Sequence, residues 1–252
     1  MNSKKELWKP YRIYPLSEAI LIGSFVFFAI FLTTYFIYHY ALDAQKGEIK
    51  EGLLRTAKVV GAFIEPDIHQ TLSAGEENSE AYLQQIKPLE EALKADHSIA
   101  YLYTAILDKE KVYFILDPTP AGDADEDGVE DKAGIMDEYP EASKDIIQAL
   151  TNKEIVISET PYTDRWGTFF SAYVPLLNSN GEMVAVLGID IEATKFFSRL
   201  EPIKRATTRT MVIGFFISFL VGSIVWFTRN FGLKINNKRK ELADEFSAKS
   251  NT

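Results

Sequence analysis

The 252-residue sequence contains no cysteine and only three histidines. Without cysteine the chain forms no disulfide bond and offers no thiolate to a metal ion. The sequence also lacks a His-rich metal motif, a nucleophile elbow and a Ser-His-Asp candidate set. We therefore expect a protein that is not an enzyme.

Basic residues are scarce in the middle of the chain. Residues 43–192 contain 30 Asp and Glu residues against 12 Lys and Arg residues, a net charge of −18 that the total of −9 conceals. Such a surface repels nucleic acid and anionic lipid and attracts cations. Nucleic acid and anionic lipid are therefore excluded as partners of the central region.

Two long apolar runs frame this acidic region. Ala19–Tyr38 has 20 residues and Thr210–Thr228 has 19, and neither run contains a charge. Each has the length that a helix needs to cross a bilayer. A cleaved signal peptide has a shorter apolar core, and a buried helix of a soluble protein is disfavoured because two such runs flank a polar middle. We predict two transmembrane helices.

Basic residues near the first run predict its orientation. Lys4, Lys5, Lys9 and Arg12 precede it, so the N-terminus is expected in the cytoplasm, although basic residues at 199–209 weaken the bias around the second run. The predicted organisation is a cytoplasmic N-terminus, a first transmembrane helix, an extracytoplasmic domain, a second transmembrane helix and a short cytoplasmic tail: 1–18, 19–40, 41–209, 210–228 and 229–252.

The extracytoplasmic segment reads as an α+β domain. Apolar residues spaced by three and four over 42–64 predict a helix that continues out of the membrane, and a second helix is predicted after Ser79, with a kink or break at Pro88. Alternating strands follow at 99–107 and 112–117, and "GTFFSAYVPLLNSNGEMVAVLGIDIEA" predicts a hairpin turning at Asn180-Gly181. With a short strand at "EIVISE", the expected sheet is mostly antiparallel and has about five strands.

The stretches "YLYTAILDKEKVYFILD" and "PYTDRWGTFFSAYVPLLNSNGEMVAVLGIDIEA" resemble the PAS-like, or Cache, sensor domain of bacterial transmembrane receptors. The resemblance covers roughly residues 41–209. It implies a long N-terminal helix, a curved sheet with a ligand pocket on one face, and a two-pass protein of the inner membrane whose sensor domain lies in the periplasm or outside the cell. Such domains precede diguanylate cyclase, histidine kinase or chemoreceptor outputs.

The sequence after the second apolar run departs from those receptors. About 24 residues remain, without a cyclase or kinase motif or a phosphoacceptor histidine. We therefore expect either a receptor cut before its output domain or a short sensor that acts on a cytoplasmic partner. The small residues Gly214, Ser218 and Gly222 predict close helix contact in lipid, which we interpret as a homodimer contact through the membrane helices.

Strand alternation groups the candidate ligand residues by face. The expected groups are Tyr101 with Tyr103, Tyr113 with Ile115 and Asp117, Phe169 with Ser171 and Tyr173, and Val186 with Gly188 and Asp190; Arg165 and Trp166 come from the preceding loop. A pocket with aromatic rings, one Arg and one carboxylate suits a small polar ligand such as an amino acid or an amine. The alternative is a core of tyrosines with a structural salt bridge between Arg165 and an aspartate.

The loop "AGDADEDGVEDKAG" resembles half of a calcium-binding loop. Asp123, Asp125, Asp127 and Asp131 occupy ligand positions of the EF-hand pattern, and Gly128 stands at the turn position. The twelfth position, which needs a bidentate Glu, is Gly134. We therefore favour an exposed acidic lid over a calcium site, keep weak magnesium binding as an alternative, and expect no tightly held cofactor.

Two other functions compete with the sensor reading. One is an adhesive or cation-binding surface module without a signalling role, and the other is an extracytoplasmic enzyme, which the missing catalytic motifs disfavour. Signalling needs helices that run without interruption from the membrane to the sheet, whereas adhesion does not. His69, in "PDIHQTL", is interpreted as an ordinary surface histidine.

Overall fold

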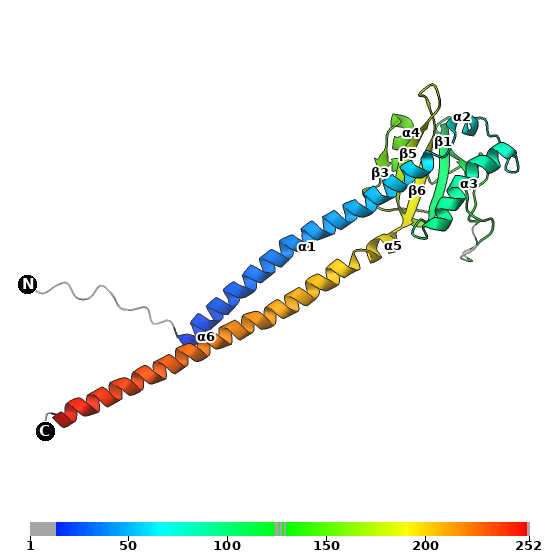
Figure 1. Cartoon of the computed structure of the whole chain (residues 1–252). Coiled ribbons are helices and arrows are strands. Elements are labelled where there is room, and N and C mark those ends of the chain that lie inside the picture. Colours follow the sequence, from blue (N-terminus) through cyan, green and yellow to red (C-terminus); the bar gives the residue numbers. More distant parts are fainter. Residues whose placement is uncertain (1–13, 124–125, 127, 129, 251–252) are drawn as a thin grey trace, which may run out of the picture. The chain divides into compact units, whose positions relative to one another are not determined.

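The computed structural model describes residues 14–123, 126, 128 and 130–250. The chain divides into two compact units, one made by the two chain ends up to residue 42 and from residue 202, and one made by residues 43–201. The elements, coloured along the chain in Figure 1, are α1 (Pro15–Gly61), α2 (Pro66–His69), α3 (Glu80–Ala95), β1 (Tyr101–Asp108), β2 (Lys111–Leu116), α4 (Lys144–Asn152), β3 (Val156–Ile157), β4 (Tyr162–Asp164), β5 (Gly167–Leu177), β6 (Met183–Glu192), α5 (Ala193–Ser198) and α6 (Glu201–Ser250).

The two apolar runs lie within the long helices α1 and α6. By length and composition, both helices are able to cross a membrane, with mean hydropathies of 2.3 and 2.2 over their most apolar windows. In lipid a helix satisfies all of its backbone hydrogen bonds internally, which is why such runs form helices. The prediction of two membrane helices therefore agrees with the secondary structure.

The small residues of α6 contact α1 of the same chain. A Cβ added to Gly222 would lie 3.1 Å from the carbonyl oxygen of Ala19, and one added to Gly23 would lie 3.1 Å from that of Ser218. At the end of this contact Arg229 Nε pairs with Glu18 Oε2 at 2.5 Å. The small residues therefore bring the two helices of one chain together, while a homodimer contact through the membrane helices stays a prediction.

The second half of α1 packs on the domain of residues 43–201. Its side chains at the predicted spacing of three and four, Ile49, Ala57 and Val60, are at most 6% exposed. Ile64, just beyond the helix, is 4% exposed. One continuous helix thus contains both the first apolar run and a stripe that is buried in the domain of residues 43–201.

The domain of residues 43–201 contains one six-stranded antiparallel sheet, which confirms the α+β class. The strand order is β2-β1-β6-β5-β3, and β4 pairs with β5 outside this path. The predicted hairpin is formed by β5 and β6, and Gly181 in its turn has a φ of +78°, a conformation that glycine adopts without steric cost. The short strand β4 was not expected from the sequence.

Helices cover both faces of the sheet. One core contains side chains of α1, of α3 and of the segment after α2, such as Ala57, Leu89 and Leu72, against Leu102, Leu187 and Ile189 of the sheet. The other contains Ile146, Ala149 and Leu150 of α4 against Tyr103, Tyr173 and Val186. The alternation of side chains along each strand separates these two cores. We call the face that carries Tyr103 and Tyr173 the cavity face.

Helix α3 begins where the sequence predicts. The Ser79 hydroxyl accepts a hydrogen bond from the Tyr82 N–H at 3.1 Å, which satisfies one of the free donors of the first turn. The helix then continues through Pro88 to Ala95, so the expected break at Pro88 does not occur.

Candidate functional site

A small cavity lies on the cavity face, beside the start of β1 and the end of β6. Its volume is about 20 Å³, enough for about one water molecule. The walls are aromatic and the polar groups are mostly acidic. The lining residues are Tyr101, Tyr103, Phe114, Asp117, Asp131, Ala133, Tyr139, Asp164, Trp166, Phe169 and Asp190.

Asp190 is the most deeply buried carboxylate of this cavity. It lies on β6 between Tyr101 of β1 and Ser171 of β5, and it is 3% exposed. Burial raises the pKa of Asp190 to about 8, while the hydroxyls of Ser171 and Tyr103 lie close enough to oppose part of this rise. These three groups lie near one another, but Asp190 Oδ1, Ser171 Oγ and Tyr103 OH make no hydrogen bond of ordinary geometry with any described residue. The floor of the cavity therefore has unused hydrogen-bonding capacity.

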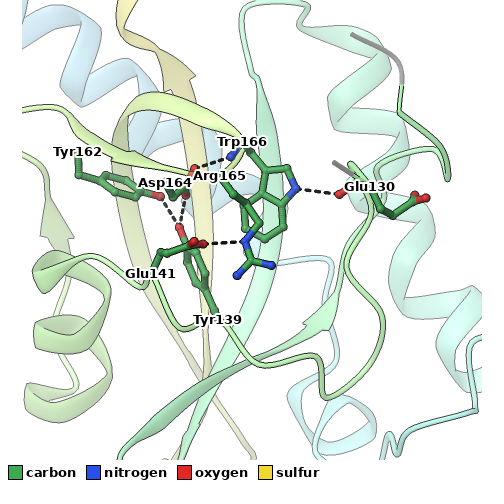
Figure 2. Close-up of polar contacts among 7 residues, drawn as sticks. All are labelled: Glu130, Tyr139, Glu141, Tyr162, Asp164, Arg165 and Trp166. Atoms are coloured by element: carbon green, nitrogen blue, oxygen red, sulfur yellow. Dashed lines mark hydrogen bonds and ion pairs between the residues drawn. The ribbon is translucent and has the colours of Figure 1, made fainter. Parts of the chain in front are cut away.

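A second acidic group, Asp164, lies at the side of the cavity. It ends β4, and its Oδ2 accepts a hydrogen bond from the Tyr139 hydroxyl, which also shares one of 2.8 Å with the Tyr162 hydroxyl (Figure 2). Asp164 Oδ1 accepts a hydrogen bond from the backbone N–H of Trp166 at 3.0 Å. Burial raises the pKa of Asp164, as it does for Asp190. Because β4 was not expected, sequence reasoning missed Tyr139, Tyr162 and Asp164 as site residues.

Trp166 closes the aromatic wall. Its indole N–H donates to the backbone oxygen of Glu130 at 3.0 Å, which ties the indole to the acidic loop (Figure 2). The ring also lies edge-on to Phe114, with the centroids 5.7 Å apart. The prediction that a loop residue before β5 folds over the sheet therefore agrees with the position of Trp166.

Arg165 does not line the cavity. Its Nε donates to Glu141 Oε2 at 2.7 Å, and its guanidinium carbon lies 5.1 Å from the centre of the Trp166 ring (Figure 2). Arg165 and Trp166 are neighbours in a two-residue turn between β4 and β5, so the ring faces the cavity while the guanidinium pairs outside it. The salt-bridge partner of Arg165 is therefore a glutamate rather than the aspartate of our alternative, while its contact with a ligand carboxylate stays a prediction.

A β-bulge between β1 and β2 changes which side chains face the cavity. Thr104 pairs with Leu116 and Ala105 pairs with Phe114, so Ile115 has no partner across the ladder. The extra residue shifts the alternation by one. Phe114 and Asp117 therefore line the cavity, whereas Ile115 packs in the opposite core, and the expected grouping of Tyr113 and Ile115 with Asp117 is wrong.

Asp117 fastens the base of the acidic loop. Its Oδ1 accepts from the Thr119 N–H at 2.9 Å and its Oδ2 accepts from the Ala133 N–H at 2.7 Å. Lys132 Nζ donates to the backbone oxygen of Asp117 at 2.6 Å. Burial nevertheless raises the pKa of Asp117. Since both carboxylate oxygens accept backbone hydrogen bonds, Asp117 shapes the cavity more than it offers a free acceptor.

The tyrosines of the predicted site take different roles. Tyr101 and Tyr103 line the cavity, and Tyr103 packs on Gly188, where an added Cβ would lie 2.7 Å from the Tyr103 ring. The predicted close approach at Gly188 is thus made by a side chain of the protein. Tyr173 is fully buried beneath α4, and its hydroxyl lies 3.2 Å from Ser143 Oγ, so it belongs to the core.

Calcium or magnesium binding by the acidic loop stays a prediction. Asp125 and Asp127 lie outside the described residues. Among the described residues no group of three or more His, Cys, Asp or Glu side chains could hold a metal ion. Asp123 Oδ2 accepts from the Gly128 N–H at 2.7 Å, and Asp131 lines the cavity.

His69 is buried, contrary to our interpretation of it as a surface residue. It is 2% exposed at the end of α2, and its Nε2 lies 2.7 Å from Thr104 Oγ1. Burial lowers the pKa of His69 to about 4, so the ring is neutral at neutral pH. The sequence signal for a buried position was weak because α2 is a helix of only four residues.

No protein-family model and no curated protein matches the chain. Among solved structures, the ligand-binding domain of the Campylobacter jejuni chemoreceptor Tlp3 in complex with 4-methylisoleucine matches with a TM-score of 0.44 and 12% identity, over 68% of this chain and 63% of that one. The E. coli DcuS sensor domain matches with a TM-score of 0.44 and 16% identity, over 63% of this chain and 98% of that one. A methyl-accepting chemotaxis protein X matches with a TM-score of 0.42 and 18% identity, over 71% and 67%.

By their names, these three structures come from a chemoreceptor, a sensor domain and a chemotaxis protein. This chain spans about 63% of the length of the Tlp3 chain. At such identities and TM-scores the similarity does not identify a ligand for this chain.

Proposed function

We propose that the chain is a two-pass membrane receptor whose outer domain binds a small organic amine in its ammonium form. The supporting observation is Asp190: a buried carboxylate with an unpartnered oxygen, inside an aromatic cavity, in a site to which no Lys or Arg of the described lining contributes. Burial keeps the Asp190 side chain in its neutral acid form unless a cation pairs with the carboxylate. A ligand ammonium would supply that cation.

The aromatic walls support the same ligand class. Tyr101, Tyr103 and Trp166 present ring faces and edges around the carboxylates, and cations bind favourably over such faces. A second carboxylate, Asp164, adds negative charge at the side of the cavity. An amino acid is disfavoured because its carboxylate would meet two acidic groups, while Arg165 is already paired with Glu141.

Binding requires the cavity to enlarge. Its 20 Å³ is too small for a molecule of several heavy atoms. Trp166 is the side chain best placed to move, because a single indole hydrogen bond ties it to Glu130. We infer that ligand binding rearranges Trp166 and the residues that contact it.

A signal would reach the cytoplasm through the long helices. Helix α1 joins the domain core to the first apolar run without interruption, and α5 leads from β6 into α6 with two residues between them. A ligand shifts such helices only if it binds two conformations with different affinity. The output is either a domain beyond this chain or a cytoplasmic partner of its tail.

The test is calorimetric titration of the 252-residue chain in lipid nanodiscs with ethanolamine, choline, glycine and acetate. We expect ethanolamine to release or absorb heat on binding and acetate to give no heat of binding. Asp190→Asn should weaken amine binding up to roughly a hundredfold, since a hydrogen bond to a charged group contributes about 1.5–3 kcal/mol. Asp108→Asn, an exposed carboxylate at the far end of β1, is the matched control and should change nothing. Binding of acetate but not of amines would refute the proposal.

A further inference from the structure

The bulge between β1 and β2 is held by a side chain. The Leu116 N–H donates to Thr104 Oγ1 at 3.0 Å. Thr104 is fully buried and lies at the point where the register shifts. A buried N–H without a partner is costly, so the hydroxyl stabilises the bulged register over a regular one.

The Thr104 hydroxyl also forms a hydrogen bond with His69. Nε2 of the ring lies 2.7 Å from Thr104 Oγ1, and both side chains are at most 2% exposed. His69 belongs to α2, and Thr104 follows the cavity-lining Tyr103 on β1, so the Thr104 side chain lies on the face of the sheet opposite the cavity. The pair therefore connects a helix on one face to the strand register that determines the other.

The register decides what the cavity contains. One residue after Leu116, Asp117 accepts from the N–H groups of Thr119 and Ala133 and so closes the base of the acidic loop. Without the bulge, a shift by one residue would turn Asp117 to the opposite face. Asp117 and the loop base then could not line the cavity.

We propose that His69 and Thr104 are positioning residues of the ligand site, which lock the bulge that turns Asp117 and the base of the acidic loop to the cavity. Neither residue lines the cavity. This proposal rests on the proposed function for the role of the site, but the register itself is independent of any ligand.

The test is site-resolved hydrogen exchange of the ligand-free chain in nanodiscs, comparing Thr104→Val with Thr104→Ser. Valine keeps the shape but removes the hydroxyl, whereas serine keeps the hydroxyl. We expect the amides of Leu116, Thr119 and Ala133 to exchange at least tenfold faster in Thr104→Val and to return to the original rates in Thr104→Ser. The Ala172 amide, on β5, serves as the internal control and should keep its rate in both variants.

Faster exchange at Leu116 alone would overturn the proposal, because the loop base would then not depend on the bulge. Equal loss of protection at Ala172 would also overturn it, because the effect would be general unfolding. His69→Leu tests the other member of the pair: we expect the same three amides to accelerate, and unchanged rates would overturn the role of His69. No ligand is present, so failure of amine binding leaves this experiment unaffected.

Discussion

At the scale of single residues, Asp190 combines two properties that seldom occur together. It lies in the middle of a sheet between Tyr101 and Ser171, where burial favours the neutral acid. It also keeps one oxygen without a partner among the described residues. A bound ammonium would favour the carboxylate instead, so the protonation of Asp190 links ligand binding to pH.

The first residue-scale prediction concerns the stability of the ligand-free chain. A carboxyl whose pKa is about 8 when folded and about 3.8 when unfolded holds a proton only in the folded state between these values. The free energy of unfolding should therefore fall by about 1 kcal/mol between pH 7 and pH 8. His69 has the opposite effect: burial lowers its pKa to about 4, so the free energy of unfolding rises with pH up to the unfolded pKa of 6.5. Most of that rise therefore lies below pH 7.

Denaturant melts at the two pH values measure this difference. Asp190→Asn should reduce the fall to whatever Asp117 and Asp164 contribute, since burial raises the pKa values of these two groups as well. A fall of the same size in Asp190→Asn would mean that Asp190 does not titrate in this range.

At the scale of elements, packing of small residues decides which helices meet. Gly23 on α1 faces Ser218 and Gly222 on α6, and no side chain separates the backbones at this point. Lipid offers no hydrophobic drive for helices to associate, so close backbone packing is what holds them. The contact joins the two membrane runs of one chain and leaves their outward faces, with Leu21 and Ile224 more than half exposed, for lipid or other proteins.

The element-scale prediction is that Gly222→Ile separates the two helices. The new Cβ would lie 3.1 Å from the Ala19 carbonyl oxygen, which is closer than ordinary contact. Because the chain has no cysteine, spin labels can be attached at Leu21→Cys and Ile224→Cys alone. The distance between the labels should increase by about 1–3 Å, on the scale at which side-chain size changes helix separations.

Gly232→Ile is the matched control for this measurement. Gly232 lies on the same helix, but an added Cβ would meet nothing within 4 Å. The label distance should stay unchanged in this variant. An unchanged distance in Gly222→Ile as well would show that the two helices do not pack through Gly222 in the membrane.

At the scale of the whole molecule, charge separates the parts of the chain. The acidic region of residues 43–192 carries a net charge of −18, while basic residues gather before the first apolar run and after the second. Basic segments remain in the cytoplasm during membrane insertion. The acidic domain is therefore expected outside, where its negative surface would concentrate cationic ligands before they reach the cavity.

The whole-molecule prediction is the topology itself. A reporter that is active only outside the cytoplasm should be active when fused after Glu182 and inactive when fused after Lys240. A cytoplasm-specific reporter at the same two positions should give the reverse pattern and serves as the control. Activity of the first reporter after Lys240 alone would contradict the orientation.

The sequence by itself determined most of the elements, though not β4, because periodicity and local signals act over a few residues. The buried stripe of α1, the Ser79 cap, the β5–β6 hairpin and the position of Asp190 on the sheet follow from such patterns. Only the tertiary structure decided what the side chains meet. Arg165 pairs with Glu141 over 24 positions, and His69 is buried against Thr104 over 35 positions. The bulge that brings Asp117 to the cavity joins Leu116 to Thr104 over 12 positions. Contacts at such separations depend on the register of strands and the packing of helices, which no local pattern specifies.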